Sequence, residues 1–138
     1  MPTWKSPQLT FFVESRAEAL RKGHRSRAAF LGEHVLHGSV LERLGEAGWG
    51  VAVAAFPGEE GLAELLAELK ERGIPTDLWL NLAEEDGYWS SLANVPATRR
   101  AVDRLLDWIE REGLAVRRIG LDLEPPLRLT RCLTERRL

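Results

Sequence analysis

One pattern recurs three times along this chain and limits the folds available to it: a helix, a glycine that ends the helix, a short turn and an apolar strand. The glycines are Gly48, Gly73 and Gly113. Glycine ends helices readily because it adopts the left-handed backbone conformation without steric cost. Strands that alternate with helices in this way indicate a parallel sheet with right-handed crossover connections.

The apolar runs and the helical periodicity place the elements. Residues 51–56 form an unbroken apolar run, which is typical of a parallel strand covered on both faces. Leucines at 62, 65, 66 and 69 have the spacing of one helix face. The other predicted strands are 9–14, 28–31, 78–82 and 116–124, and the predicted helices are 16–22, 39–47, 62–72 and 96–112. We therefore predict an α/β fold of about five parallel strands alternating with helices.

Two architectures fit this rhythm. The first is a half or truncated (β/α)8 TIM barrel, whose complete form needs ~250 residues. The second is an open doubly wound sheet. Residues 1–126 are predicted to form a single α/β domain, and residues 127–138, with four arginines and one glutamate, an arginine-rich tail.

Composition excludes several classes of protein. A net charge of −2 gives no electrostatic footprint for nucleic acid. No apolar run reaches membrane-spanning length, and the N-terminal residues lack a signal sequence, so a cytoplasmic protein is expected. Cys132 is the only cysteine, which leaves no cysteine-rich metal site. Phosphate-loop, dinucleotide and Gly-x-Ser-x-Gly motifs are missing, so no cofactor is predicted.

Histidines 34 and 37 lie three residues apart beside an acid. Without a located third ligand they more often solvate a loop than bind a metal. No metal site is predicted, although the pair leaves the question open.

The last predicted strand ends in two acids and a double proline. Asp122 and Glu124 are two residues apart and therefore share one strand face, and Pro125 ends the strand because it has no N–H to donate. In α/β barrels, catalytic groups lie at such carboxyl ends of strands. Glycoside hydrolysis needs two carboxyl groups, and repulsion between neighbouring carboxylates raises the pKa of one of them. The alternative is that both acids only solvate the strand end.

The loop after the strand at 78–82 supplies further candidates. It combines Glu85 and Asp86 with the aromatic pair Tyr88 and Trp89, and the strand before it carries Asn81. Acids and amides hydrogen bond to sugar hydroxyls, while aromatic faces stack on sugar rings. These residues are predicted to bind substrate. The alternative for Trp89 is packing against the helix at 96–112.

The segment Ile119-Gly120-Leu121-Asp122-Leu123-Glu124-Pro125-Pro126 resembles the strand-four motif Asp-x-Asp-x-Glu of chitinase-like glycoside hydrolases (family 18). The resemblance implies that Glu124 is the proton donor. It further implies that Asp122 positions the acetamido group of the substrate, which serves as the nucleophile. The first Asp of the motif falls on Gly120.

Two functions remain in view. The first is a glycoside-hydrolase-like site that binds a carbohydrate and uses Glu124 and Asp122. The second is a non-catalytic α/β domain, or a truncated relic of a barrel, that binds another chain. Half a barrel would expose a sheet edge and an apolar interior, so a homo-oligomer is expected. Salt bridges from Arg117, Arg118 or the tail arginines to the two acids would favour the second function, because a paired carboxylate stays ionised.

Overall fold

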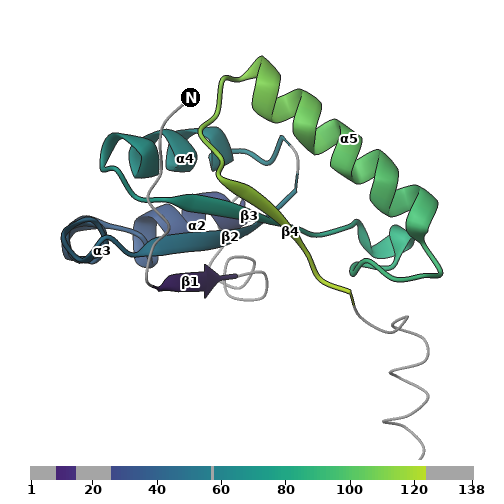
Figure 1. Ribbon diagram of the computed structural model, residues 1–138, viewed down its shortest axis with the longest axis horizontal. Coiled ribbons are helices and arrows are strands. Elements are labelled where there is room, and N and C mark those ends of the chain that lie inside the picture. The colour runs from purple at the N-terminus through teal and green to yellow at the C-terminus, as the bar shows by residue number, and fades with distance from the viewer. Residues whose placement is uncertain (1–8, 15–25, 57, 124–138) are drawn as a thin grey trace, which may run out of the picture.

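The protein is built on one parallel sheet. The computed structural model describes residues 9–14, 26–56 and 58–123. Glu124, the predicted helix 16–22 and the predicted tail 127–138 lie outside these residues. The sheet contains β1 (Thr10–Val13), β2 (Gly50–Ala55), β3 (Thr76–Leu80) and β4 (Arg118–Leu121), and all neighbouring strands are parallel (Figure 1). Their order across the sheet is their order in the sequence.

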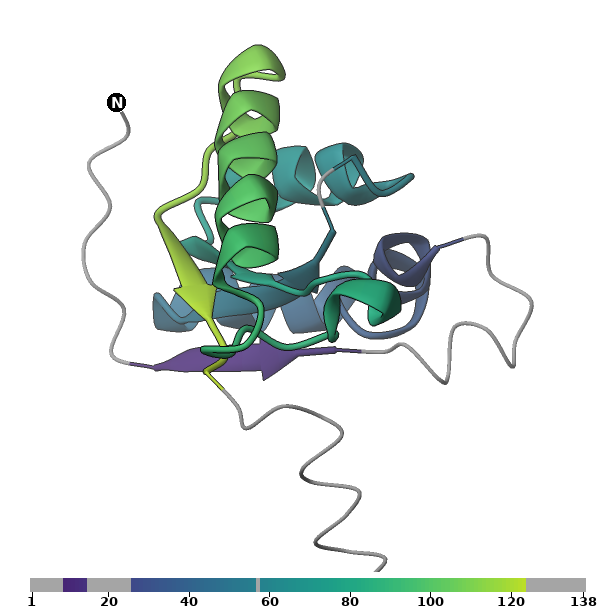
Figure 2. The same cartoon turned by 90° about the vertical axis from the view of Figure 1, so that its right-hand side faces the viewer.

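Helices α2 (Arg27–His34) and α3 (Gly38–Ala47) lie between β1 and β2, and α4 (Leu62–Glu71) lies between β2 and β3. A short 3-10 turn, η1 (Glu84–Asp86), and α5 (Val95–Arg111) lie between β3 and β4. The predicted α/β class is confirmed. Figure 2 shows β1 along the lower rim of the sheet and the long α5 standing beside β4. Of the helices that the structure describes, none is long and apolar enough to cross a membrane.

All four helices pack on one face of the sheet. Val51, Val53 and Leu78 project from that face into a single apolar core. Each helix contributes buried side chains to the same core: Ala28, Leu31, Leu41, Leu44, Leu62, Leu65, Leu66, Leu69, Ala101, Leu105 and Trp108. The predicted leucine face of residues 62–69 is therefore confirmed. The described residues show neither the reversal of strand order nor the helices on both faces that mark a doubly wound sheet.

No described helix packs on the opposite face of the sheet, where side chains of β1 and β3 lie over β2. On that face β2 presents only Gly50, Ala52 and Ala54. Over these small residues Phe12 of β1 meets Trp79 of β3, with ring centroids 5.2 Å apart in an edge-to-face arrangement. Ala52 and Ala54 are consequently buried although no described helix covers them. This face is called the open face below.

The three glycine stops adopt the backbone conformation that the sequence predicts. Gly48, Gly73 and Gly113 all have positive φ angles, of 63°, 68° and 62° respectively. Each closes the helix before it, and the chain then turns into the next strand.

The predicted strand at 28–31 is wrong, because these residues lie in α2. The Ser26 hydroxyl caps this helix by accepting a hydrogen bond from the Ala29 N–H at 3.0 Å. Ala28 and Leu31, three residues apart, are both buried, which is the spacing of a helix face. The described sheet therefore has four strands, not five.

A buried ion pair fastens β4 to β3. The Arg117 guanidinium donates two hydrogen bonds to the Asp77 carboxylate, at 2.8 and 2.6 Å, and Arg118 donates two more, at 3.2 and 2.8 Å. Burial alone would raise the pKa of Asp77. Hydrogen bonds and charge from both arginines outweigh burial, so the pKa of Asp77 lies below its ordinary value of 3.8.

Replacing Asp77 by Asn should lower the free energy of unfolding by about 3 kcal/mol at neutral pH, because two arginines lose their carboxylate. Since the pKa of Asp77 is lowered in the folded chain, the ion pair stabilises fully above pH ~4 and is lost as pH falls through the folded-state value. Urea unfolding at several pH values should therefore show the gap between wild type and variant shrinking below pH ~4.

Glu68→Gln is the matched control, because it removes the exposed pair between Glu68 and Arg72. This variant should lower the free energy of unfolding by at most ~0.5 kcal/mol. An equal loss of unfolding free energy in both variants would contradict the stabilising role of Asp77. So would a stability difference between the wild type and the Asp77 variant that does not narrow in acid.

Candidate functional site

A carboxylate at the end of β1 is the centre of a polar cluster at the carboxyl edge of the sheet. Glu14 Oε1 accepts a hydrogen bond from the Tyr88 hydroxyl at 2.6 Å and another from the Asn81 side-chain amide at 3.3 Å. These partners come from the end of β3 and the loop after it. Glu14 thus links strands that are not neighbours, across the small residues of β2.

The loop that carries Tyr88 is held by Asn94. The Asn94 side-chain oxygen accepts from the Ser91 N–H at 2.7 Å, and its amide donates to the carbonyls of Asp86 and Trp89 at 2.7 and 2.8 Å. Tyr88 itself adopts a positive φ of 63°, a conformation that non-glycine residues rarely take. The loop is therefore a fixed structure that presents Tyr88 to Glu14.

The same loop reaches β4. Ser90 and Leu123 form an isolated parallel β-bridge, which brings the loop next to Asp122. The Ser90 hydroxyl is buried and, within the described part of the chain, has no hydrogen-bond partner. Asp122 is half-buried, and no side chain among the described residues forms an ion pair or hydrogen bond with it.

A groove lies on the open face, over the middle and the amino ends of the strands. Its volume is about 370 Å³. Phe12, Ala52, Trp79 and Gly120 line its middle, and Thr10, Asp77, Arg118 and Ile119 complete its lining. Asn81 and Asp122 follow Trp79 and Gly120 by two residues, so they continue the same face of β3 and β4. A volume of this size is in the range of small-ligand sites.

The structure brings some of the predicted site residues together and leaves others apart. Asn81 and Tyr88 meet at Glu14, and the Trp89 ring lies edge-on to Tyr88 with centroids 5.3 Å apart. Glu85 is exposed and Asp86 half-buried in η1, and within the described residues neither carboxylate joins this cluster. Glu124, the predicted proton donor, lies outside the described residues.

Two residues of the site were missed by sequence reasoning. Glu14 ends the first predicted strand just as Asp122 and Glu124 lie at the end of the last, so the same strand-end argument would have selected it. Trp79 lies two residues before Asn81, and strand alternation places both on one face. Its ring contact with Phe12 depends on the sheet, which the sequence pattern alone does not define.

Gly120, the position of the first Asp in the chitinase-like motif, has no room for a side chain. A Cβ at this position would lie 2.9 Å from Trp79 Cε3. The Trp79 ring therefore occupies the space that an aspartate would need.

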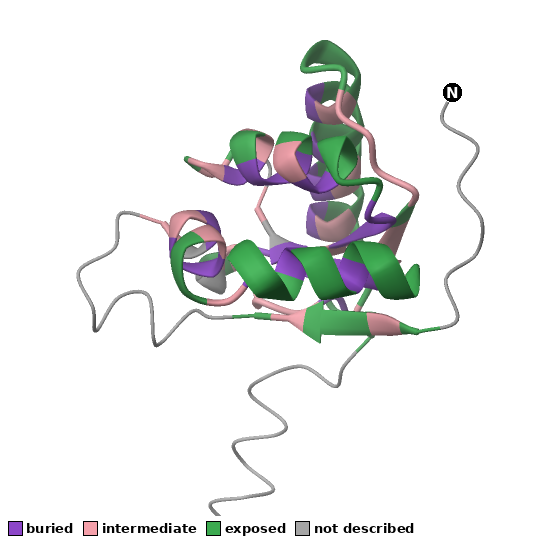
Figure 3. Cartoon of the chain, turned by 90° about the vertical axis from the view of Figure 1, so that its left-hand side faces the viewer, coloured by how far each residue is buried: buried purple, intermediate pink, exposed green. Residues whose placement is uncertain are grey.

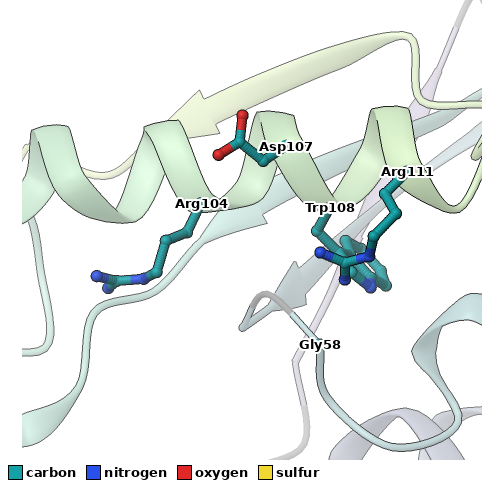
Figure 4. A pocket seen from close by; sticks show the side chains of 5 residues that line it. All are labelled: Gly58, Arg104, Asp107, Trp108 and Arg111. Carbon is teal, nitrogen blue, oxygen red and sulfur yellow. The ribbon is translucent and has the colours of Figure 1, made fainter.

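Other parts of the chain give weaker candidates. Within the described residues, no three His, Cys, Asp or Glu side chains are grouped closely enough to hold a metal ion. His34 lies in the last turn of α2, and His37 precedes α3. A hollow of about 240 Å³ lies between α5 and the loop at Gly58, and Figure 4 shows Trp108 and Arg111 directed toward that loop. None of the predicted site residues lines this hollow.

Comparison with known proteins adds no constraint, because no protein-family model matches the chain, and no curated protein or solved structure is significantly similar to it.

Replacing Asn94 by Ala should loosen the loop, because two main-chain carbonyls and the Ser91 N–H lose their partner at once. The free energy of unfolding is expected to fall by about 1–3 kcal/mol. Amide hydrogen exchange should rise at residues 86–91. Leu92→Ala, a fully exposed position in the same loop, is the control and should leave exchange unchanged. Unaltered protection in the Asn94 variant would contradict the proposed organisation of the loop.

Replacing Gly120 by Ala should destabilise the chain by about 1–2 kcal/mol, because the new methyl group displaces the Trp79 ring. The control is Gly32→Ala in α2, where the new Cβ would lie 3.9 Å from a Leu65 methyl group. This control should instead stabilise by about 0.5 kcal/mol, since alanine favours a helix over glycine. Thermal unfolding measures both, and a neutral Gly120 variant would show that the ring moves freely.

Proposed function

We propose that the open face and the carboxyl edge of the sheet bind a carbohydrate, and that Glu124 and Asp122 act on its glycosidic bond. One observation carries the proposal. The Glu14 carboxylate, held by hydrogen bonds from Asn81 and Tyr88, lies on the same face of the sheet as Asp122 and as a groove lined by the Phe12 and Trp79 rings.

The groove has the chemistry that sugar recognition requires. Phe12 and Trp79 offer apolar ring surface for the faces of a pyranose. Glu14 supplies an acceptor for hydroxyl groups, and the hydrogen bonds that it receives from Asn81 and Tyr88 fix its carboxylate before a ligand binds. Preorganised polar groups bind more tightly because less side-chain freedom is lost on binding.

The catalytic part of the proposal rests on Asp122, which directly follows β4, and on Glu124, which lies outside the described residues. Arg117 and Arg118 are both engaged with Asp77, so they do not neutralise Asp122. By the chitinase-like resemblance, Glu124 donates a proton to the leaving oxygen, and Asp122 orients the acetamido group that attacks the anomeric carbon. Protonation breaks the glycosidic bond, and water then opens the cyclic intermediate and returns a proton to Glu124.

We further infer that the sheet is a half or truncated (β/α)8 barrel. Sequential order of parallel strands, with helices on one face, is the arrangement of barrel strands. The contacts of Glu14 with Asn81 and of Phe12 with Trp79 across β2 support a sheet that is concave on the open face.

A second candidate is a domain of the same fold without hydrolytic activity. The observation that favours it is Gly120, where Trp79 fills the place of the first acid of the motif. Such a domain would bind the sugar, or another chain, without cleaving it.

The experiment combines calorimetric binding of N-acetylglucosamine oligomers with hydrolysis of a panel of chromogenic glycosides. Glu124→Gln should reduce hydrolysis by about 10²–10⁴-fold while binding persists, because only the proton donor is lost. Glu14→Gln should weaken binding by about tenfold, because neutral hydrogen bonds are weaker than charge-assisted ones.

Glu110→Gln on the exposed surface of α5 is the matched control and should change neither property. Binding without hydrolysis in the wild type would favour the second candidate. A wild type that neither binds nor cleaves any of these sugars would overturn the proposal.

A further inference from the structure

The first and last strands of the sheet carry a concentration of exposed apolar side chains. Figure 3 shows the middle of β1 exposed. Phe11 and Phe12 of β1 are 41% and 51% exposed, and Leu123 after β4 is 78% exposed. Leu9 and Leu121 add to the same two strands. Within the described residues, β1 and β4 each pair with a strand on one side only, and apolar residues gathered on two such edges indicate surfaces that are covered by another chain.

Beside β1, on the helix-bearing face, lies an apolar hollow of about 280 Å³. Phe11, Val13, Val40, Leu44 and Trp49 form much of its lining, and Arg43 is its single charged residue. The Phe11 and Trp49 rings meet there, with centroids 5.5 Å apart. The hollow lies where a further strand beside β1 would place the side chains of its helix-facing residues.

The outer edge of β4, which pairs with no further strand among the described residues, offers such side chains. Ile119 packs against the core on the helix-bearing face. By strand alternation, Leu121 and Leu123 face the same way, and both are exposed. A second copy of β4 laid parallel to β1 would thus direct two leucines toward the hollow.

We propose that two copies of this chain join β4 of each to β1 of the other, in parallel, and so close an eight-stranded barrel. The four strands that the structure describes in each copy, in sequential order, give the eight that a parallel (β/α) barrel contains. The two seams are equivalent, which is the symmetry of a twofold dimer. The occupant of the hollow is Leu121 and Leu123 of the second copy.

The exposed apolar side chains of the two edge strands supply about half of the surface that a stable dimer buries. The exposed parts of the five apolar side chains on β1 and β4 amount to on the order of 400 Å² per copy. A stable interface buries about 800 Å² per partner, and the two strand edges with their flanking helices supply the remainder.

Closure would complete the candidate site. The carboxyl ends of all eight strands would surround one mouth, and Glu14 of one copy would lie on the strand next to Asp122 of the other. This functional consequence rests on the proposed carbohydrate site, whereas the dimer itself does not.

The first test is the mass of the full chain in solution, by light scattering over a range of concentrations. The expected mass is twice the 15.5 kDa of one chain. Leu123→Lys should weaken the dimer at least tenfold, because a charge would enter the apolar hollow. Leu92→Lys is the matched control, since Leu92 is 97% exposed and lies on neither edge strand. A monomeric wild type, or equal effects of the two variants, would overturn the proposal.

The second test is disulfide trapping in a Cys132→Ser background. Phe11→Cys is combined with Leu121→Cys, and Val13→Cys with Leu121→Cys to cover a shift in register. In one chain, β1 and β4 are separated by three strand spacings, roughly 14 Å, and a disulfide cannot span more than about 7 Å between Cα atoms. A disulfide in these variants therefore joins two copies.

Covalent dimers are expected from at least one of these pairs and not from Leu92→Cys with Leu121→Cys. Failure of both pairs to cross-link would overturn the β4–β1 seam. Neither test uses a sugar. A monomer that binds oligosaccharides would contradict the dimer alone, and a dimer that binds none would contradict the proposed function alone.

Discussion

The small side chains of β2 are the constraint on which the rest of the open face depends. Side chains on β1 and β3 project from strands about 10 Å apart, too far for contact over a bulky middle strand. Because β2 presents only Gly50, Ala52 and Ala54, the Phe12 and Trp79 rings meet above it, and Glu14 reaches Asn81. The groove and the polar cluster therefore share one cause, which is the lack of bulk in the middle of the sheet.

Two polar interactions fix the opposite ends of that face. At the amino end, Asp77 joins Arg117 and Arg118, and Arg117 also reaches the Thr10 hydroxyl at 3.5 Å. At the carboxyl end, Glu14 is fixed by Tyr88 and Asn81. The Asp77 carboxylate is buried and its charge is balanced by the two arginines, so this interaction stabilises the fold. The second leaves a carboxylate exposed at the edge where parallel sheets bind ligands, so it is the one suited to recognition.

The repeating helix, glycine and strand pattern was sufficient to predict the α/β class and most elements, because burial on one face imposes a regular spacing. The pattern gave a wrong prediction at residues 28–31, because a four-residue apolar run fits either a strand or a helix. The Ser26 cap, which begins α2, distinguishes the two. Asn81 and Tyr88 were predicted as site residues, but Glu14 was not. Its role depends on a contact across two strands, which no local pattern contains.

The most direct measurement is a map of amide chemical-shift changes when N-acetylglucosamine oligomers are added to the ¹⁵N-labelled chain. The account predicts changes concentrated at residues 12–14, 79–90 and 118–122, the open face and the carboxyl edge of the sheet. Changes confined to α5 and the Gly58 loop would contradict it, as would a spectrum that the sugars leave unaltered.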